Sequence, residues 1–325
     1  MRKLLLHRVI FLLIITIEYS FAVSSQLVNT GKVDGAISDL RYKSGKIYIA
    51  TERGKVEILD FKTLKKIKVI SYPKFEDFRG ELQLPKVFSV DISPDEKKIV
   101  AVIQTTRGGR EVYLFEDGKL QKIIDRRKHL QITRLRFVDN NLILFGLGGD
   151  ELVLYDIEKD KIIYREPVGM SFFSDMEVND EKSMVAIADE SGDTKIADVK
   201  TGKVIKVIQE MNKDKAFDVD FRNKRVMTGG RDKKAVYYNL KTDHYTTFPA
   251  DDFMVFSVAL SPSGNRGAYL YNDKFDVRIV DTEEGKILTT LSGHKATPSN
   301  MRFVDENQLI IGCDDGKLYI WRIEP

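Results

Sequence analysis

Cysteine and histidine are scarce in this sequence. Cys313 is the only cysteine among 325 residues, so an intramolecular disulfide is excluded. A chain without disulfides must be stabilised by its core and by closure of its fold. Only His129, His244 and His294 follow residue 22, far apart and without paired ligand spacing. We therefore expect no metal site and no cofactor.

An excess of one charge is also lacking. The chain has 52 Lys and Arg against 49 Asp and Glu, a formal net charge of +3. So small a net charge gives no electrostatic footprint for nucleic acid, and we expect no nucleic-acid partner. Phosphate loops are missing as well, because Gly108-Gly109 and Gly148-Gly149 are bare turn pairs. With no nucleophilic Ser or Thr at a recognisable motif, we assign no catalytic residue.

Long hydrophobic runs are absent except near the N-terminus. Val9 to Ile17 is apolar apart from one Thr, follows the basic Met1-Arg2-Lys3, and precedes Ser20-Phe21-Ala22. This order predicts a cleaved signal peptide, residues 1–22, followed by a mature domain, residues 23–325. A single spanning helix is the alternative, but the run falls short of the roughly 20 apolar residues that a bilayer requires.

Removal of the predicted signal would leave a net charge of about +1, because Arg2, Lys3, Arg8 and Glu18 leave with it. No cysteine follows the apolar run, so a bacterial lipoprotein anchor is excluded and we expect no stable membrane anchor after cleavage. The short basic and apolar signal and the Lys- and Ile-rich composition favour a bacterial periplasm as the location.

What the chain does contain is a repeat. A polar residue followed by an apolar one opens a strand seven times, roughly 39 to 50 residues apart, in the range of propeller blades. Each pair precedes a turn, an apolar strand, a polar turn and an alternating third strand, and six units add a fourth strand. The fold class is all-β. The opening pairs are Asp39-Leu40, Ser89-Val90, Arg134-Leu135, Asp175-Met176, Asp218-Val219, Ser257-Val258 and Asn300-Met301.

The clearest copy of the unit runs from Gly293 to Ile323. Asp314-Asp315-Gly316 forms a turn in it, and Gly293-His294 precedes the Trp321 strand end by 25 to 30 residues. This pattern resembles the WD40 repeat, which implies a seven-bladed WD40-type β-propeller. The resemblance also implies that His294, Asp315 and Trp321 belong to a structural hydrogen-bond tetrad, with Ile311 at the place usually held by Ser or Thr. A catalytic His-Asp pair is the alternative.

The seventh unit lacks a fourth strand of its own. An open sheet edge there would invite aggregation. Gln26 to Thr30 precedes the first unit and belongs to none, so we expect it to supply the missing outer strand and close the ring. A disordered linker after the signal is the alternative.

Two stretches have the composition of a partner-binding surface. The longest connection, Ser71 to Lys86, carries Tyr72, Phe75, Phe78 and Arg79, and aromatic residues with Arg are typical interface anchors. A lid packed on the first blade is the alternative.

The second stretch is basic, and we expect it to form one positive patch; an ordinary solvated face is the alternative. Its members are Arg107, Arg110, Arg126, Arg127, Lys128, His129, Arg134 and Arg136.

Propellers of this kind are mostly rigid interaction platforms, although fold alone does not give function. In overall character the chain resembles the accessory WD40 propeller encoded with periplasmic nitrate reductase. That resemblance implies a non-catalytic role in assembly or maintenance of the reductase, with a periplasmic protein as partner. Two alternatives stay open: a propeller enzyme of the lactonase or quinoprotein type, and an outer-membrane protein assembly scaffold.

Overall fold

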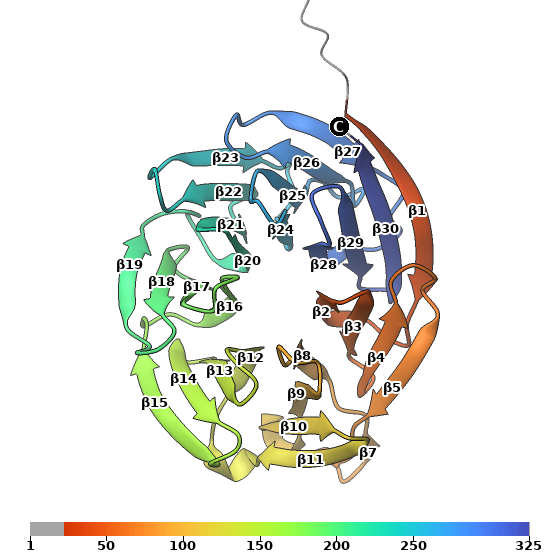
Figure 1. Ribbon diagram of the computed structural model, residues 1–325, viewed down its shortest axis with the longest axis vertical. Helices are drawn as coiled ribbons and strands as arrows, with labels where there is room; N and C mark the ends of the chain where they lie inside the picture. The colour runs from red at the N-terminus through yellow and green to blue at the C-terminus, as the bar shows by residue number, and fades with distance from the viewer. Residues whose placement is uncertain (1–22, 325) are drawn as a thin grey trace, which may run out of the picture.

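Seven four-stranded antiparallel sheets stand around a central axis in the computed structural model, which describes residues 23–324 (Figure 1). The predicted seven-bladed β-propeller is confirmed. The predicted signal peptide, residues 1–22, lies outside the described residues. Within the described range the only helical segments are two 3₁₀ turns, Thr106–Gly108 and Arg126–Lys128, and no helix there is long and apolar enough to span a bilayer.

The blades follow one another along the chain, each with its innermost strand first. Blades 1 to 3 comprise β2 (Ile37–Lys43), β3 (Lys46–Thr51), β4 (Lys55–Asp60), β5 (Lys66–Ser71); β8 (Val87–Ile92), β9 (Lys98–Gln104), β10 (Arg110–Glu116), β11 (Lys119–Ile124); and β12 (Ile132–Phe137), β13 (Leu142–Leu147), β14 (Glu151–Asp156), β15 (Lys161–Pro167). Blades 4 to 6 comprise β16 (Phe173–Val178), β17 (Met184–Asp189), β18 (Thr194–Asp198), β19 (Val204–Ile208); β20 (Ala216–Arg222), β21 (Arg225–Gly230), β22 (Lys234–Asn239), β23 (Tyr245–Pro249); and β24 (Val258–Leu260), β25 (Arg266–Leu270), β26 (Val277–Asp281), β27 (Ile287–Leu291). Blade 7 comprises β28 (Pro298–Phe303), β29 (Gln308–Cys313), β30 (Lys317–Glu324) and the N-terminal β1 (Ser24–Lys32).

The core lies between neighbouring blades. The second strand of each blade is apolar because both of its faces are covered, as in β13, where Ile143, Leu144 and Phe145 are fully buried. Phe145 stacks on Tyr155 of the same blade, with ring centroids 5.9 Å apart. Each blade therefore buries its faces only by packing on its two neighbours, and the ring is stable only when it is closed.

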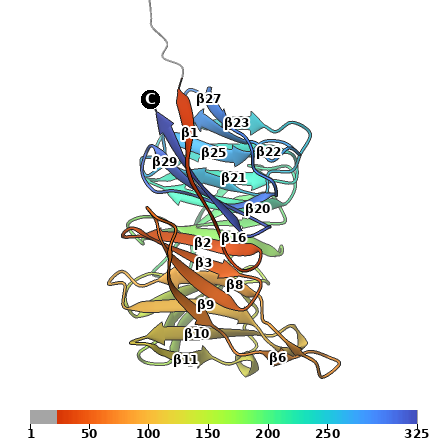
Figure 2. The ribbon, with the colours of Figure 1, turned by 90° about the vertical axis from the view of Figure 1, so that its right-hand side faces the viewer.

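Closure comes from the N-terminal strand. β1 pairs antiparallel with β30 from Ser24 opposite Glu324 to Lys32 opposite Lys317, with one irregularity at Val28 (Figure 2). The prediction that Gln26 to Thr30 supplies the outer strand of the last blade is confirmed, and the strand extends beyond those five residues. The last blade thus joins the two ends of the described chain.

One face of the ring carries the long connection. Because the strands alternate in direction, all blade-to-blade connections and all turns between second and third strands lie at one face, which we call the insertion face. The Ser71 to Lys86 connection forms a short hairpin there, with β6 (Phe75–Glu76) paired to β7 (Leu82–Gln83). In Figure 2 this hairpin projects beyond the ring.

Candidate functional site

Polar side chains line the central channel in two tiers, both on the innermost strands. A β-bulge precedes the first tier in six blades and re-aims the inner strand at that point. The first tier comprises Asp39, Ser89, Arg134, Asp175, Asp218, Ser257 and Asn300. The second tier, two residues later, comprises Arg41, Asp91, Arg136, Glu177, Asp220 and Arg302.

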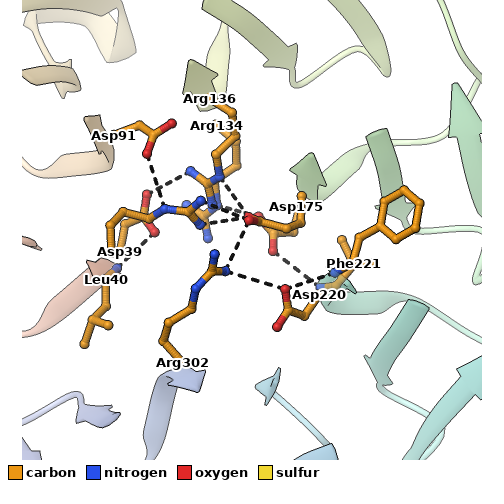
Figure 3. Close-up of polar contacts among 12 residues, drawn as sticks. Asp39, Leu40, Asp91, Arg134, Arg136, Asp175, Asp220, Phe221 and Arg302 are labelled. Atoms are coloured by element: carbon orange, nitrogen blue, oxygen red, sulfur yellow. Dashed lines mark hydrogen bonds and ion pairs between the residues drawn. The ribbon is translucent and has the colours of Figure 1, made fainter. Parts of the chain in front are cut away.

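Glu177 of blade 4 is the centre of the second tier. Arg41 of blade 1 donates two hydrogen bonds to its carboxylate, of 2.8 and 2.9 Å. Arg136 of blade 3 donates one of 3.0 Å, and Arg302 of blade 7 donates one of 3.1 Å. Figure 3 shows the guanidinium groups of Arg136 and Arg302 reaching into the channel from separate blades. Although burial opposes ionisation, the guanidinium groups of Arg41 and Arg136 hold the pKa of Glu177 well below its usual range.

Four other channel carboxylates, in blades 1, 2 and 5, each join their own blade to the next one. In each case a carboxylate oxygen accepts a hydrogen bond from a backbone N–H on the inner strand of the following blade. Such bonds fix the blades at a set spacing, because a buried carboxylate and a buried backbone N–H both need partners. The bonds run from Val90 to Asp39 (2.9 Å), from Phe137 to Asp91 (2.7 Å), from Val258 to Asp218 (2.8 Å) and from Leu260 to Asp220 (2.9 Å).

Two carboxyl groups of the first tier share the side of the channel between blades 4 and 5. Asp175 accepts a hydrogen bond of 2.6 Å from Arg134. Burial, then the charge of Asp175 and a hydrogen bond with it, raise the pKa of Asp218 well above its usual value. The arrangement can therefore hold one proton between the two carboxyl groups while Asp175 stays paired with Arg134.

Side chains fill most of the channel. The space left among them is a cavity of about 70 Å³. The described residues contain no group of three or more His, Cys, Asp or Glu side chains placed to hold a metal ion. What the channel groups do chemically is to neutralise one another and connect the blades.

A wider cavity of about 630 Å³ opens at the mouth of the channel on the insertion face. Its walls include Phe88, Phe256 and Asn300, and Arg134 is at its edge. The predicted partner residue Arg110 stacks on one of these walls, with its guanidinium carbon 3.8 Å from the centre of the Phe88 ring. Arg110 is therefore stacked at the channel mouth, away from the tip of the hairpin.

The hairpin presents some of the predicted partner residues and buries another. Phe78 is 89% exposed at its tip, with the Arg79 guanidinium 5.1 Å from the ring centre. Phe75 is half-buried, and with Phe78 and Arg107 it lines a cavity of about 410 Å³. Tyr72 is only 5% exposed and packs edge-on against Tyr113 of blade 2, so it belongs to the core.

The prediction that the basic residues form one positive patch is wrong. Arg134 and Arg136 turn into the channel, where their charges are paired with carboxylates. The segment from Arg126 to His129 follows β11 outside the channel, and its 3₁₀ turn is capped by the Asp125 side chain. Alternation along β12 sends its charged residues inward, because in this fold the inner strand has a polar channel on one side.

The predicted tetrad in blade 7 is partly formed. The Trp321 indole N–H donates to His294 Nε2 over 3.2 Å, as expected for two of its members. His294 Nδ1 bonds the carbonyl of Phe275 in blade 6 over 2.8 Å, and burial lowers the pKa of His294. Asp315 accepts from the Lys317 backbone N–H (3.0 Å) and so stabilises only its own turn. The network therefore joins two blades, where the sequence predicted a tie within one.

A fuller network of the same kind occurs in blade 5, which sequence reasoning missed. Thr228 donates to the Asn212 side-chain oxygen (2.7 Å), and the Asn212 amide donates to Asp232 (2.9 Å). Asn212 here takes the place that the sequence led us to expect for histidine. The signal was present, since Thr228 lies in the second strand and Asp232 in the following turn, but Asn212 replaces the histidine that marks the pattern in blade 7.

Comparison with known proteins agrees with this architecture. Residues 285–322, which run from the end of blade 6 through blade 7, match the model of the family described as WD domain, G-beta repeat. The chain is a WD40-like β-propeller. No curated protein matches its sequence. Propellers of this type are typically non-catalytic scaffolds for protein interaction.

Proposed function

We propose that this WD40-like propeller is a non-catalytic periplasmic scaffold that binds a partner protein through its insertion face. The β6–β7 hairpin is the principal contact. The partner is a component of periplasmic nitrate reductase, and binding serves assembly or maintenance of that enzyme. The periplasmic location is supported by the basic, apolar and small-residue order of residues 1–22, and the partner by the resemblance of the chain in overall sequence character.

The observation that carries the proposal is the exposure of large apolar side chains at the hairpin. Phe78 is 89% and Leu82 64% exposed, on a short hairpin that projects from a rigid ring. On the same face, the connection between β15 and β16 exposes Met170 and Phe172. Apolar side chains gathered at one face are typical of protein interaction sites, and an aromatic beside an arginine is a common anchor.

The channel supports a scaffold over a propeller enzyme. Its arginines and carboxylates are engaged with one another and with backbone groups, so they hold blades at fixed positions. A rigid ring places the hairpin at a defined position and lowers the entropy lost when a partner binds.

The test is affinity capture from periplasmic extract with the mature chain, comparing Phe78→Ser with Tyr245→Ser. Tyr245 is 67% exposed on the outer strand β23, away from the insertion face, and is the matched control. We expect the wild type and Tyr245→Ser to recover nitrate reductase subunits, identified by mass spectrometry. Phe78→Ser should recover at least about tenfold less of these subunits, because loss of a central anchor residue costs about 2 kcal/mol or more of binding free energy. Equal recovery by all three proteins, or no reductase subunit with the wild type, contradicts the proposal.

A further inference from the structure

We infer that the groove between the β6–β7 hairpin and blade 2 receives a partner segment in which an apolar side chain lies next to a carboxylate. This inference rests on the proposed function, because it specifies the chemistry of the partner at the same surface. It concerns a groove at the rim of the ring, separate from the mouth of the central channel.

The groove has an apolar floor with an open end. Phe75, Phe78 and Leu84 line the cavity of about 410 Å³ on the hairpin side, and Gln104 and Arg107 line it on the blade 2 side. Phe75 and Gln104 also line an adjoining cavity of about 350 Å³. The two cavities therefore adjoin along Phe75 and Gln104, and we treat them together as one groove.

Two positive charges along this groove, those of Arg107 and Lys74, have no counter-ion among the described residues. Arg107 makes no ion pair with any residue in the part of the chain that the structure describes, and its side chain is exposed. The nearby carboxylate of Asp77 is occupied inside the hairpin, where it accepts from the Arg79 and Glu81 backbone N–H groups and from Gln83. An incoming carboxylate would therefore meet an available guanidinium, which can bind it with two parallel hydrogen bonds.

The backbone of Arg107 is held in a fixed conformation. It occupies a left-handed backbone conformation, with φ of 57°, inside the 3₁₀ turn Thr106–Gly108. The turn is closed by hydrogen bonds from Gly109 N–H to Thr106 (3.1 Å) and from Thr105 N–H to Gly109 (3.0 Å). A closed turn adds no backbone ordering to the cost of binding, so only the freedom of the side chain is lost when the guanidinium binds.

The distribution of charge favours a protein segment over nucleic acid. A phosphate backbone is recognised by a row of cations, whereas here the two unpaired cations, Arg107 and Lys74, stand among aromatic, aliphatic and acidic side chains. At the far end of the groove Lys122 is already paired with Glu111 over 2.8 Å. The combination of an available guanidinium and an apolar pocket matches an apolar residue followed or preceded by Asp or Glu.

A random peptide library displayed on phage and selected on the chain of residues 23–325 tests this inference. We expect the enriched peptides to carry Phe, Leu, Ile or Trp within two residues of Asp or Glu. A synthetic representative should bind Arg107→Glu and Phe78→Ser about tenfold more weakly or worse than wild type, as for anchor residues. Lys241→Glu, a charge reversal in an exposed turn of the opposite face, should bind as wild type does.

Three results would overturn the inference. The selection could enrich no peptide, it could enrich peptides without acidic residues, or the synthetic peptide could bind wild type and Arg107→Glu equally well. A thermal melt of each variant confirms folding before its binding is compared. If Phe78→Ser loses the reductase while the peptides show no acidic preference, the inference fails and the proposed function stands. If acidic peptides bind here and no periplasmic partner depends on Phe78, the proposed function fails and the groove chemistry stands.

Discussion

The guanidinium of Arg41 in blade 1 forms a two-pronged hydrogen-bonded pair with the carboxylate of Glu177 in blade 4, at 2.8 and 2.9 Å. The two residues are 136 positions apart in the chain and both side chains are buried. Arg136 and Arg302 complete the set of cations on the same carboxylate. One acidic side chain thus connects four of the seven blades across the channel.

Replacement of Glu177 by Gln is therefore expected to destabilise the whole ring. The amide leaves buried guanidinium groups without a counter-charge, which costs about 3 to 5 kcal/mol. The measurement is urea unfolding followed by fluorescence of Trp321, the only tryptophan in the chain. Glu81→Gln, at an exposed hairpin position, is the control and should shift the free energy of unfolding by about 0.5 kcal/mol at most. Equal urea-unfolding midpoints for the two variants would show that Glu177 does not stabilise the ring.

The carboxyl pair of Asp175 and Asp218 gives a dependence of stability on pH. The folded state raises the pKa of Asp218, so stability from this group is present below its unfolded pKa of about 3.9 and is lost as pH rises through the folded pKa. Asp218→Asn carries a neutral amide that can still accept from Val258 N–H. We expect this variant to be more stable than wild type at pH 8. The difference in the free energy of unfolding should shrink toward pH 4, and urea unfolding at each pH measures it.

Asp175→Asn is the contrasting variant. It removes the carboxylate that pairs with Arg134, so it should be less stable than wild type at pH 8. Stability on the acid side depends on other groups, because Asp39 and Glu177 have lowered pKa values and their contribution is lost as pH falls. An Asp218→Asn protein whose stability follows the wild-type pH profile would show that the pair does not share a proton.

Deletion of Gln26 to Thr30 is expected to lower the melting temperature by far more than the loss of five surface residues would. β30 would lose most of its outer partner and expose a row of unpaired backbone groups. Differential scanning calorimetry and light scattering should show a lower melting temperature and aggregation. Replacing the exposed Leu27 and Val28 by Thr keeps the strand and should change little. A truncated protein that melts within a degree or two of its parent would contradict closure by β1.

Tyr72 and Phe78 should separate stability from association, although they are only six residues apart. Tyr72→Ala removes a buried ring that packs on Tyr113 and should cost about 3 kcal/mol or more. Phe78→Ala removes an exposed ring and should leave the melting temperature unchanged while it weakens partner association. If Phe78→Ala lowers the melting temperature as Tyr72→Ala does, the hairpin is a lid packed on the ring.

The sequence predicted most of the fold because each strand has a local signature. Alternation, tight turns and the repeat length placed the strands to within a few residues, and the unassigned segment before the first unit predicted closure. Ser257, predicted to open a strand, lies one residue before β24. The hairpin was predicted as a long connection with interface composition, but its division into a buried Tyr72 and an exposed Phe78 depends on packing against blade 2.

The channel could not be predicted in the same way. Its charged residues stand at the strand-opening positions and two residues further on, where alternation alone predicts a solvated face. Arg41, Glu177 and Arg302 come within 3.1 Å only after all seven blades close into a ring. A count of charges at these two positions in each repeat would have indicated a polar channel, because charges on six of the seven inner strands have no such meaning in an open sheet.

Photo-crosslinking from position 78 tests the central claim most directly. A p-benzoylphenylalanine in place of Phe78, in the chain expressed in its native host, reacts only with what touches the hairpin tip, and the same group in place of Tyr245 reports an outer strand. The account predicts an adduct with a periplasmic nitrate reductase component from position 78 and none from position 245. No such adduct from position 78, or the same adduct from both positions, would contradict it.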